Sequence, residues 1–264
     1  MLKTIKQKIA SFKSSKKQEK QNSYTIDPND IFLVSYPKSG NTWLRFLIGN
    51  YFSANQCDFT NIHSIIPDIH YDPSKINKIK EPRIIKSHNS FCPKYRKVIY
   101  LVRDGRDVAV SYYYHYLKFK QNQDSISFNE YLKQFNAGQV DYGLWADHIN
   151  SWLDNFNSID KYLIIKYEDI HKNPFDSLKK VIKFAELSID EERIKKSVES
   201  SKLENMQSIE KKQSDYDPIL SKTDNKINFV RSGQVGEWQS LFTESMKNEF
   251  LKIHGNALAK LNYI

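Results

Sequence analysis

The sequence has few cysteines and no long apolar run. Only two cysteines, Cys57 and Cys92, occur in 264 residues, so a disulfide framework is excluded and a reducing, cytoplasmic location is expected. No stretch reaches the ~20 apolar residues that a transmembrane helix needs. Histidine and cysteine pairs at metal-ligand spacing are also missing, so no metal site is expected.

The charge is strongly positive. The formal net charge is +9, which suits a protein that handles a polyanion. No helix-turn-helix, zinc-finger or ribonucleoprotein motif accompanies the lysines, so nucleic acid is disfavoured as a partner. A polyanionic nucleotide is the ligand that this charge favours.

Residues 1–24 are expected to form a basic N-terminal segment. No acidic residue precedes Glu19, and the apolar core of a signal peptide is missing. The apolar residues between Leu2 and Phe12 share one helical face, which leaves a packed helix, a frayed tail or a membrane-surface helix as alternatives. Residues 25–264 are long enough for one domain with a single core.

The segment SYPKSGNTWLRF, residues 35–46, joins an expected strand to an expected helix. The first N–H groups of a helix have no partner within it and bind anions readily. Lys38 adds a mobile charge, and nearby hydroxyls add donors. Lys38 precedes Gly40, so this is not a Walker A loop but another P-loop-like phosphate-binding loop. A structural turn with a solvated lysine is the alternative.

Two further segments carry cations at expected loop positions. Arg103 follows the apolar run 98–102, and ligands of parallel sheets bind beyond the carboxyl ends of the strands. Arg103 and Lys38 are therefore expected to converge on one polyanion, unless Arg103 only pairs with Asp107. Near the C-terminus, RSGQVGEW (residues 231–238) places Arg231 beside glycines that permit close backbone approach to an anion.

In this order, the three segments closely resemble motifs of the cytosolic-type sulfotransferase family, over roughly residues 28–245. The resemblance implies an α/β fold: a single domain with a central parallel sheet flanked by helices. It implies transfer of a sulfuryl group from 3′-phosphoadenosine-5′-phosphosulfate (PAPS) to a hydroxyl or amine. The implied nucleotide-binding residues are Lys38, Ser39, Gly40, Asn41, Thr42 and Trp43 for the phosphosulfate end, and Arg103, Ser111, Arg231, Ser232 and Gly233 for the 3′-phosphate.

Residues 82–88, PRIIKSH, resemble the family's PRxxKTH, whose histidine is the catalytic base. The resemblance thus assigns His88 as the base. Lys86 lies two residues away on an extended segment and projects to the same side. Lys38 can neutralise charge on the leaving oxygen. Tyr167, in IIKYED, matches the tyrosine that helps to hold adenine in this family.

The chain departs from the family pattern at several positions. Asn41 and Ser87 stand where threonine is usual, and Ser232 where lysine is usual. The last change removes a charge near the 3′-phosphate, which predicts weaker nucleotide binding. The family's dimer motif would fall at residues 239–248, where only Thr243 survives. A monomer, or a dimer that does not use this segment, is therefore expected.

The acceptor is not specified by any motif. A small molecule, glycan or lipid is compatible with the aromatic residues in segments expected near the pocket, namely Phe59, Tyr71, Phe91, Tyr113, Phe119 and Tyr142. His63 and His70 lie in another such segment, whereas His148 is expected to be packed in the core. Two other functions remain as alternatives: a nucleotide or small-molecule kinase, and a non-catalytic polyanion-binding module.

Apolar runs and helical spacing also predict the elements of the domain. Strands are expected at 30–35, 83–87, 98–102 and 162–166, and helices at 41–54, 106–119, 127–136, 143–157, 173–186, 190–201 and 243–261. The polar stretch from Met206 to Phe229 is expected to be a long loop, of the kind that forms lids or lacks order.

Overall fold

A computed structural model describes residues 24–54, 56–79, 81–119, 126–215, 221, 223–224 and 226–264. It contains a four-stranded sheet in the order β2-β1-β3-β4, and every neighbouring pair is parallel. The strands are β1 (Ile31–Val34), β2 (Ile84–Ser87), β3 (Lys97–Val102) and β4 (Lys161–Lys166). The four strands predicted from the sequence are confirmed. The basic segment lies outside the described residues, apart from Tyr24.

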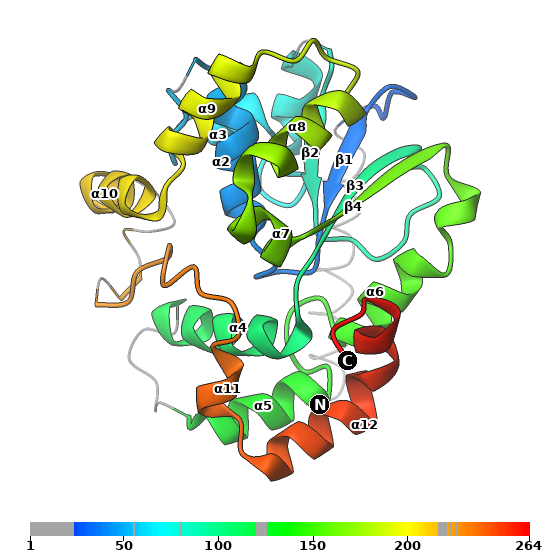
Figure 1. Ribbon diagram of the computed structural model, residues 1–264, viewed down its shortest axis with the longest axis vertical. Helices are drawn as coiled ribbons and strands as arrows, with labels where there is room; N and C mark the ends of the chain where they lie inside the picture. The colour runs from blue at the N-terminus through cyan, green and yellow to red at the C-terminus, as the bar shows by residue number, and fades with distance from the viewer. Residues whose placement is uncertain are drawn as a thin grey trace, which may run out of the picture.

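Helices cover both faces of the sheet (Figure 1). One face carries α2 (Asn41–Phe52), α8 (Pro174–Phe184) and α9 (Glu191–Ser200), and the other carries α4 (Gly105–Phe119), α5 (Phe128–Asn136), α6 (Trp145–Leu153) and α12 (Glu244–Lys260). Side chains alternate along β1, so Phe32 and Val34 enter one core while Ile31 and Leu33 enter the other. The parallel α/β fold is thereby confirmed.

Side chains cap several of these helices as their sequences suggest. Ser127 and Glu130 form a capping box at α5. Asp190 accepts the backbone N–H of Arg193 at α9. The shorter elements are α3 (Ile62–Ile65), α7 (Tyr167–Lys172), α11 (Trp238–Leu241) and the 3-10 turns η1 (Pro73–Lys78) and η2 (Phe156–Ser158).

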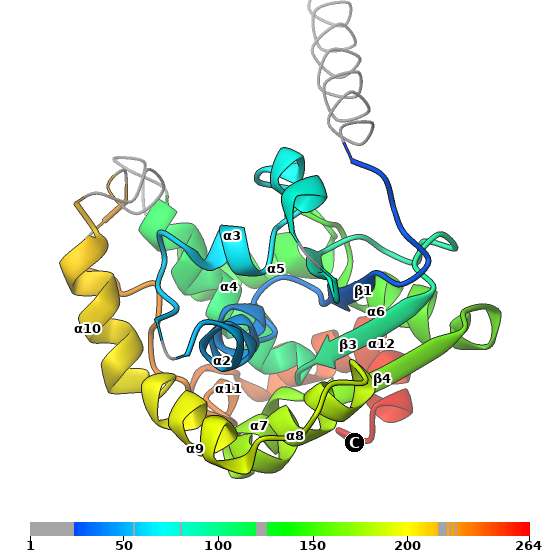
Figure 2. The same cartoon turned by 90° about the horizontal axis from the view of Figure 1, so that it is seen from above.

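The expectation of a long loop from Met206 to Phe229 is wrong for its first part. Helix α10 (Leu203–Gln213) occupies that part and follows α9 along one side of the molecule (Figure 2). Apolar residues recur at every third position, at Leu203, Met206 and Ile209, and Met206 is buried. Residues 226–233 then run between α10 and α4 without regular structure (Figure 1).

The carboxyl ends of all four parallel strands meet at one edge of the sheet. The loop 35–40, His88, Arg103 and Tyr167 each follow directly from one strand. In the ranges that the structure describes, no helix combines the length and the apolar character that crossing a membrane requires.

Candidate active site

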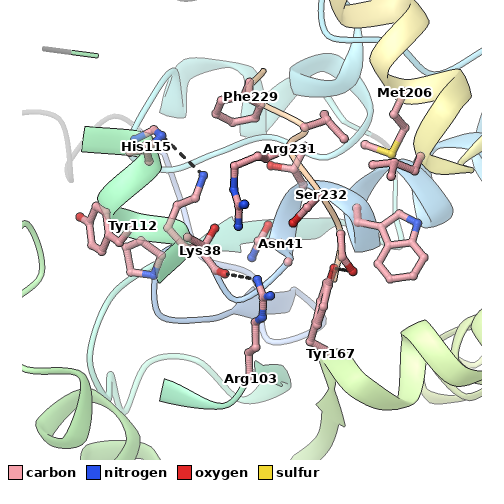
Figure 3. Close-up of a pocket in the computed structure, with 18 of the residues that line it drawn as sticks. Lys38, Asn41, Arg103, Tyr112, His115, Tyr167, Met206, Phe229, Arg231 and Ser232 are labelled. Atoms are coloured by element: carbon pink, nitrogen blue, oxygen red, sulfur yellow. Dashed lines mark hydrogen bonds between the residues drawn. The ribbon is translucent and has the colours of Figure 1, made fainter. Parts of the chain in front are cut away.

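A cavity of about 650 Å³ opens at the carboxyl edge of the sheet. Segments that are far apart in the sequence, between Pro37 and Gly233, line it, and Figure 3 shows many of their side chains. The predicted site residues found in its wall are Lys38, Gly40, Asn41, Thr42, Trp43, Lys86, His88, Arg103, Ser111, Tyr167, Arg231, Ser232 and Gly233. Ser39 is the exception, because its side chain is buried beneath the loop.

The loop between β1 and α2 has the backbone geometry of an anion cradle. Lys38 and Gly40 both have positive φ angles, 68° and 96°. A Cβ atom on Gly40 would lie 2.3 Å from Cδ2 of Tyr167, so only glycine fits there. No side chain caps the start of α2, and Ser39 Oγ is buried without a hydrogen-bond partner within the described structure. The N–H groups at the start of α2 fit a phosphate or sulfonate.

Three cationic side chains surround the same space (Figure 3). Desolvation, followed by the charges of Arg103 and Arg231, lowers the pKa of Lys38 to about 7. Arg103 Nε is buried without a partner among the described residues. An anion placed between these groups would relieve their repulsion and satisfy the free donors. The residues present thus fit a polyanion.

Arg103 has both of the positions that the sequence allowed, at the ligand cavity and beside Asp107. It lines the cavity, and its Nη2 atom lies 3.8 Å from Asp107 Oδ2. The same Nη2 donates to the carbonyl of Gln234 at 2.8 Å. The ion pair therefore holds the guanidinium at the cavity wall.

The C-terminal motif folds back over the cavity. The guanidinium of Arg231 pairs with the carboxylate of Glu237. Two backbone N–H groups of this segment, those of residues 236 and 238, donate to Asp107 at 2.7 and 3.0 Å. Tyr167 donates its hydroxyl hydrogen to the carbonyl of Gly233 at 2.7 Å. The motif is thus fastened to the starts of α4 and α7.

Two aromatic rings form one wall of the cavity. Trp43 and Tyr167 meet edge to face, with ring centroids 5.6 Å apart. The Arg103 guanidinium lies 4.2 Å from the centre of the Tyr167 ring, and Trp43 Nε1 donates to the carbonyl of Ser201 at 3.0 Å. Each ring is therefore held in place by a polar contact: Trp43 by the Ser201 carbonyl and Tyr167 by the Arg103 guanidinium. Such flat surfaces suit a purine.

His88 has a defined tautomer. Its Nδ1 lies 2.7 Å from the carbonyl oxygen of Ser35. A carbonyl oxygen only accepts, so Nδ1 carries the proton and Nε2 keeps its lone pair. Burial, followed by the charge of Lys86, lowers the pKa of His88 well below its usual range. The ring is therefore neutral at pH 7, the form that a general base requires.

Lys86 lies on the same side of the chain as His88, and both line the cavity, as the extended spacing predicts. Its ammonium is not free, because Nζ lies 2.5 Å from Asp68 Oδ2. Burial lowers the pKa of Lys86, and Asp68 opposes that shift. The ion pair keeps Lys86 charged and fixed in place.

Some residues of the cavity were not assigned from the sequence. His115 lies with Nδ1 3.5 Å from Lys38 Nζ, and Phe229 lies with its ring centre 4.8 Å from the same atom. His115 shares one helical face with Ser111 at the expected spacing of four, which is the signal that could have identified it. Nothing local in the sequence marks Phe229.

Most of the aromatic residues expected near the pocket lie elsewhere. Only Tyr142 belongs to the cavity wall, where its ring centre is 5.4 Å from that of His88. Phe59, for example, is buried against Phe46. His63 and His70 do not belong to the wall. His148 is packed as predicted, with Nδ1 2.9 Å from the hydroxyl of Tyr100.

Metal-ligating side chains do not gather in the part of the chain that the structure describes. No group of three or more histidine, cysteine, aspartate or glutamate residues has a suitable arrangement there.

Known proteins resemble this chain over most of its length. Residues 28–262 match the family model of the sulfotransferase domain. The mouse protein named sulfotransferase 1 family member D1 is 33% identical over 247 residues, which cover 86% of this chain and 83% of the relative. Mouse sulfotransferase 1B1 is 32% identical over 250 residues, covering 88% and 83%. A solved mouse sulfotransferase complexed with PAP (adenosine 3′,5′-bisphosphate) is 30% identical, with a TM-score of 0.70. The match covers 89% of this chain and 87% of the mouse chain.

Proposed function

The chain belongs to the sulfotransferase domain family and is a PAPS-dependent enzyme, and we propose that its transfer reaction uses His88 as the general base toward a hydroxyl or amine acceptor. The observation that carries the proposal is the tautomer of His88. Its bond to the Ser35 carbonyl, 2.7 Å long, leaves an unprotonated nitrogen on a residue that lines the cavity.

The reaction requires an S–O or S–N bond to the acceptor to form and one S–O bond of PAPS to break. Nε2 of His88 takes the acceptor's proton as the acceptor oxygen or nitrogen attacks sulfur. The bond from sulfur to the oxygen that bridges it to the 5′-phosphate breaks, and negative charge collects on that oxygen. Lys38 stabilises this charge, which is greatest in the transition state. Lys86, fixed by Asp68, adds positive potential beside His88.

The nucleotide is assigned to the remaining residues of the cavity. The cradle from Lys38 to Thr42 holds the phosphosulfate, and Trp43 and Tyr167 flank the adenine. Arg103, Ser111 and residues 231–233 bind the 3′-phosphate. The support is geometric, since these segments meet around one cavity and supply N–H, hydroxyl and guanidinium donors. Residues 25–264 form the catalytic domain, and the acceptor is a small molecule, a glycan or a lipid.

Substitution of His88 separates catalysis from binding. We expect His88→Ala to lower the rate of sulfuryl transfer by ~10²–10⁴-fold, the range typical of general-base catalysis. Adenosine 3′,5′-bisphosphate (PAP) should still bind with nearly unchanged affinity, because His88 faces the acceptor. Transfer of labelled sulfate to a hydroxyl acceptor and calorimetric PAP titration measure the two quantities.

Lys38→Ala provides the comparison, because it should weaken PAP binding and lower the rate together. A wild-type rate in His88→Ala would contradict the assignment and move the search for a base to His115 in the same cavity. Loss of PAP binding in His88→Ala would show instead that the ring supports the nucleotide site.

A further inference from the structure

A buried pair of opposite charges connects α4 to α10, outside the wall of the main cavity. Lys118 and Glu210 are 3% and 6% exposed, and Lys118 Nζ lies 3.7 Å from Glu210 Oε1. Charged side chains are almost never buried unless they are paired or hydrogen-bonded. The described contacts of this pair show what it holds.

Both side chains bind the backbone of residues 226–233, which we call the roof segment. Glu210 accepts the N–H groups of Phe229 and Val230 at 2.5 and 2.8 Å. Lys118 donates to the carbonyl of Ile227 at 2.6 Å. One turn earlier on α10, Gln207 donates to the carbonyls of residues 230 and 231 at 2.9 and 2.8 Å. The roof segment therefore depends on side chains of two helices for its backbone bonds.

The roof segment contributes five consecutive residues, Phe229 to Gly233, to the cavity wall. Phe229 donates its backbone N–H to Glu210, and its ring centre lies 4.8 Å from Lys38 Nζ. Arg231 follows two positions later and faces the same space (Figure 3). A shift of this backbone would displace both Phe229 and Arg231.

We propose that Glu210 and Lys118 are positioning residues that hold the roof segment in the nucleotide-binding conformation, a proposal that rests on the assignment of this cavity to PAPS. A carboxylate accepts two adjacent N–H groups at once, and an ammonium binds several carbonyls. An apolar pair of the same size could match the buried ion pair in stability, but it would leave these backbone groups unpaired. The charges therefore specify the path of the segment.

The test compares nucleotide affinity with turnover. In Glu210→Gln, an amide NH₂ faces one of the two N–H donors, and the charge of Lys118 loses its partner. The apparent dissociation constant for a ligand rises in inverse proportion to the fraction of protein in the competent conformation. We expect the Kd for PAP and the KM for PAPS to rise about tenfold or more, with kcat at saturating PAPS changed by less than about threefold. Hydrogen exchange should become faster in residues 226–233 and stay unchanged in α12.

Two controls complete the comparison. Glu192→Gln removes an exposed glutamate of α9 that pairs only with Lys195 in the described contacts, and should leave Kd and KM unchanged. Gln207→Ala keeps the buried charges but removes two roof bonds, so it should raise the Kd for PAP by a few fold. It also decides the question if Glu210→Gln does not fold.

Two results would overturn the proposal. One is a lowered melting temperature in Glu210→Gln with an unchanged Kd for PAP, since the pair would then serve stability alone. The other is an unchanged Kd in Gln207→Ala. A wild-type protein that does not bind PAP would instead contradict the nucleotide assignment, and the exchange rates of the roof segment would still report on the role of Glu210.

Discussion

Lys38, Arg103 and Arg231 come from three distant parts of the chain and meet at one cavity. Their positions could be predicted because each belongs to a motif beside a strand end or a glycine turn. Phe229 could not be predicted in the same way, whereas the spacing of four from Ser111 predicts the helical face on which His115 lies. Their contacts with Lys38 depend on how α4 and the roof segment pack, which no local pattern records.

The depressed pKa of Lys38 predicts pH-dependent nucleotide binding. With a pKa of about 7 in the free protein, Lys38 is neutral at higher pH, whereas a bound phosphate favours its charged form. Binding above pH 7 therefore takes up a proton, and PAP affinity should fall by up to about tenfold per pH unit. Calorimetry in buffers of different ionisation enthalpy measures the proton uptake directly.

Lys38→Arg is the control for this prediction, because arginine stays charged and should remove the pH dependence. Proton release on binding, or no pH dependence in the wild type, would contradict it.

The stability of the free protein has the opposite pH dependence to nucleotide affinity. Because the unfolded chain binds more protons at Lys38 above pH 7, the contribution of Lys38 to the free energy of unfolding rises with pH from about 7 to 10.

Among the elements, the strands were the most predictable because their apolar runs are continuous, and those of β1 and β3 are buried on both faces. Helix α10 was missed because its polar residues obscure the spacing of Leu203, Met206 and Ile209. The many charged residues of this segment are typical of a solvated loop, but one of them, Glu210, is buried. A polar segment is therefore a poor indicator of a loop where its charges have partners in other helices.

The segment 239–248 spans most of α11 and the first turn of α12. Thr243 accepts the N–H of Met246 and caps α12, so it has a local role without a partner subunit. We expect the chain to be a monomer, or a dimer whose contact lies elsewhere. Ser245→Arg places a bulky charge on the exposed surface of this segment. The sedimentation mass should not change, and conversion of a dimer to a monomer would disprove the prediction.

At the scale of the whole molecule, the net charge of +9 attracts any polyanion, so charge alone does not select a nucleotide. We expect selection to arise from the arrangement of the cavity, where Arg103, Ser111 and Arg231 add donors to those of the first motif. PAP carries a 3′-phosphate for this second group of donors. ATP carries all of its phosphates at the 5′ position of the ribose, and Mg²⁺ neutralises part of their charge.

We therefore expect PAP without metal to stabilise the protein far more than ATP with Mg²⁺ does. A ligand at a hundred times its Kd adds about 2.7 kcal/mol to the free energy of unfolding, which for a chain of this size raises the melting temperature by about 5–10 °C. Thermal denaturation with each nucleotide at equal ionic strength measures the difference. Arg231→Ala should reduce the PAP shift and leave any ATP shift unchanged, because it removes a donor assigned to the 3′-phosphate. The reverse ranking would show that the cavity recognises a triphosphate and would favour a kinase.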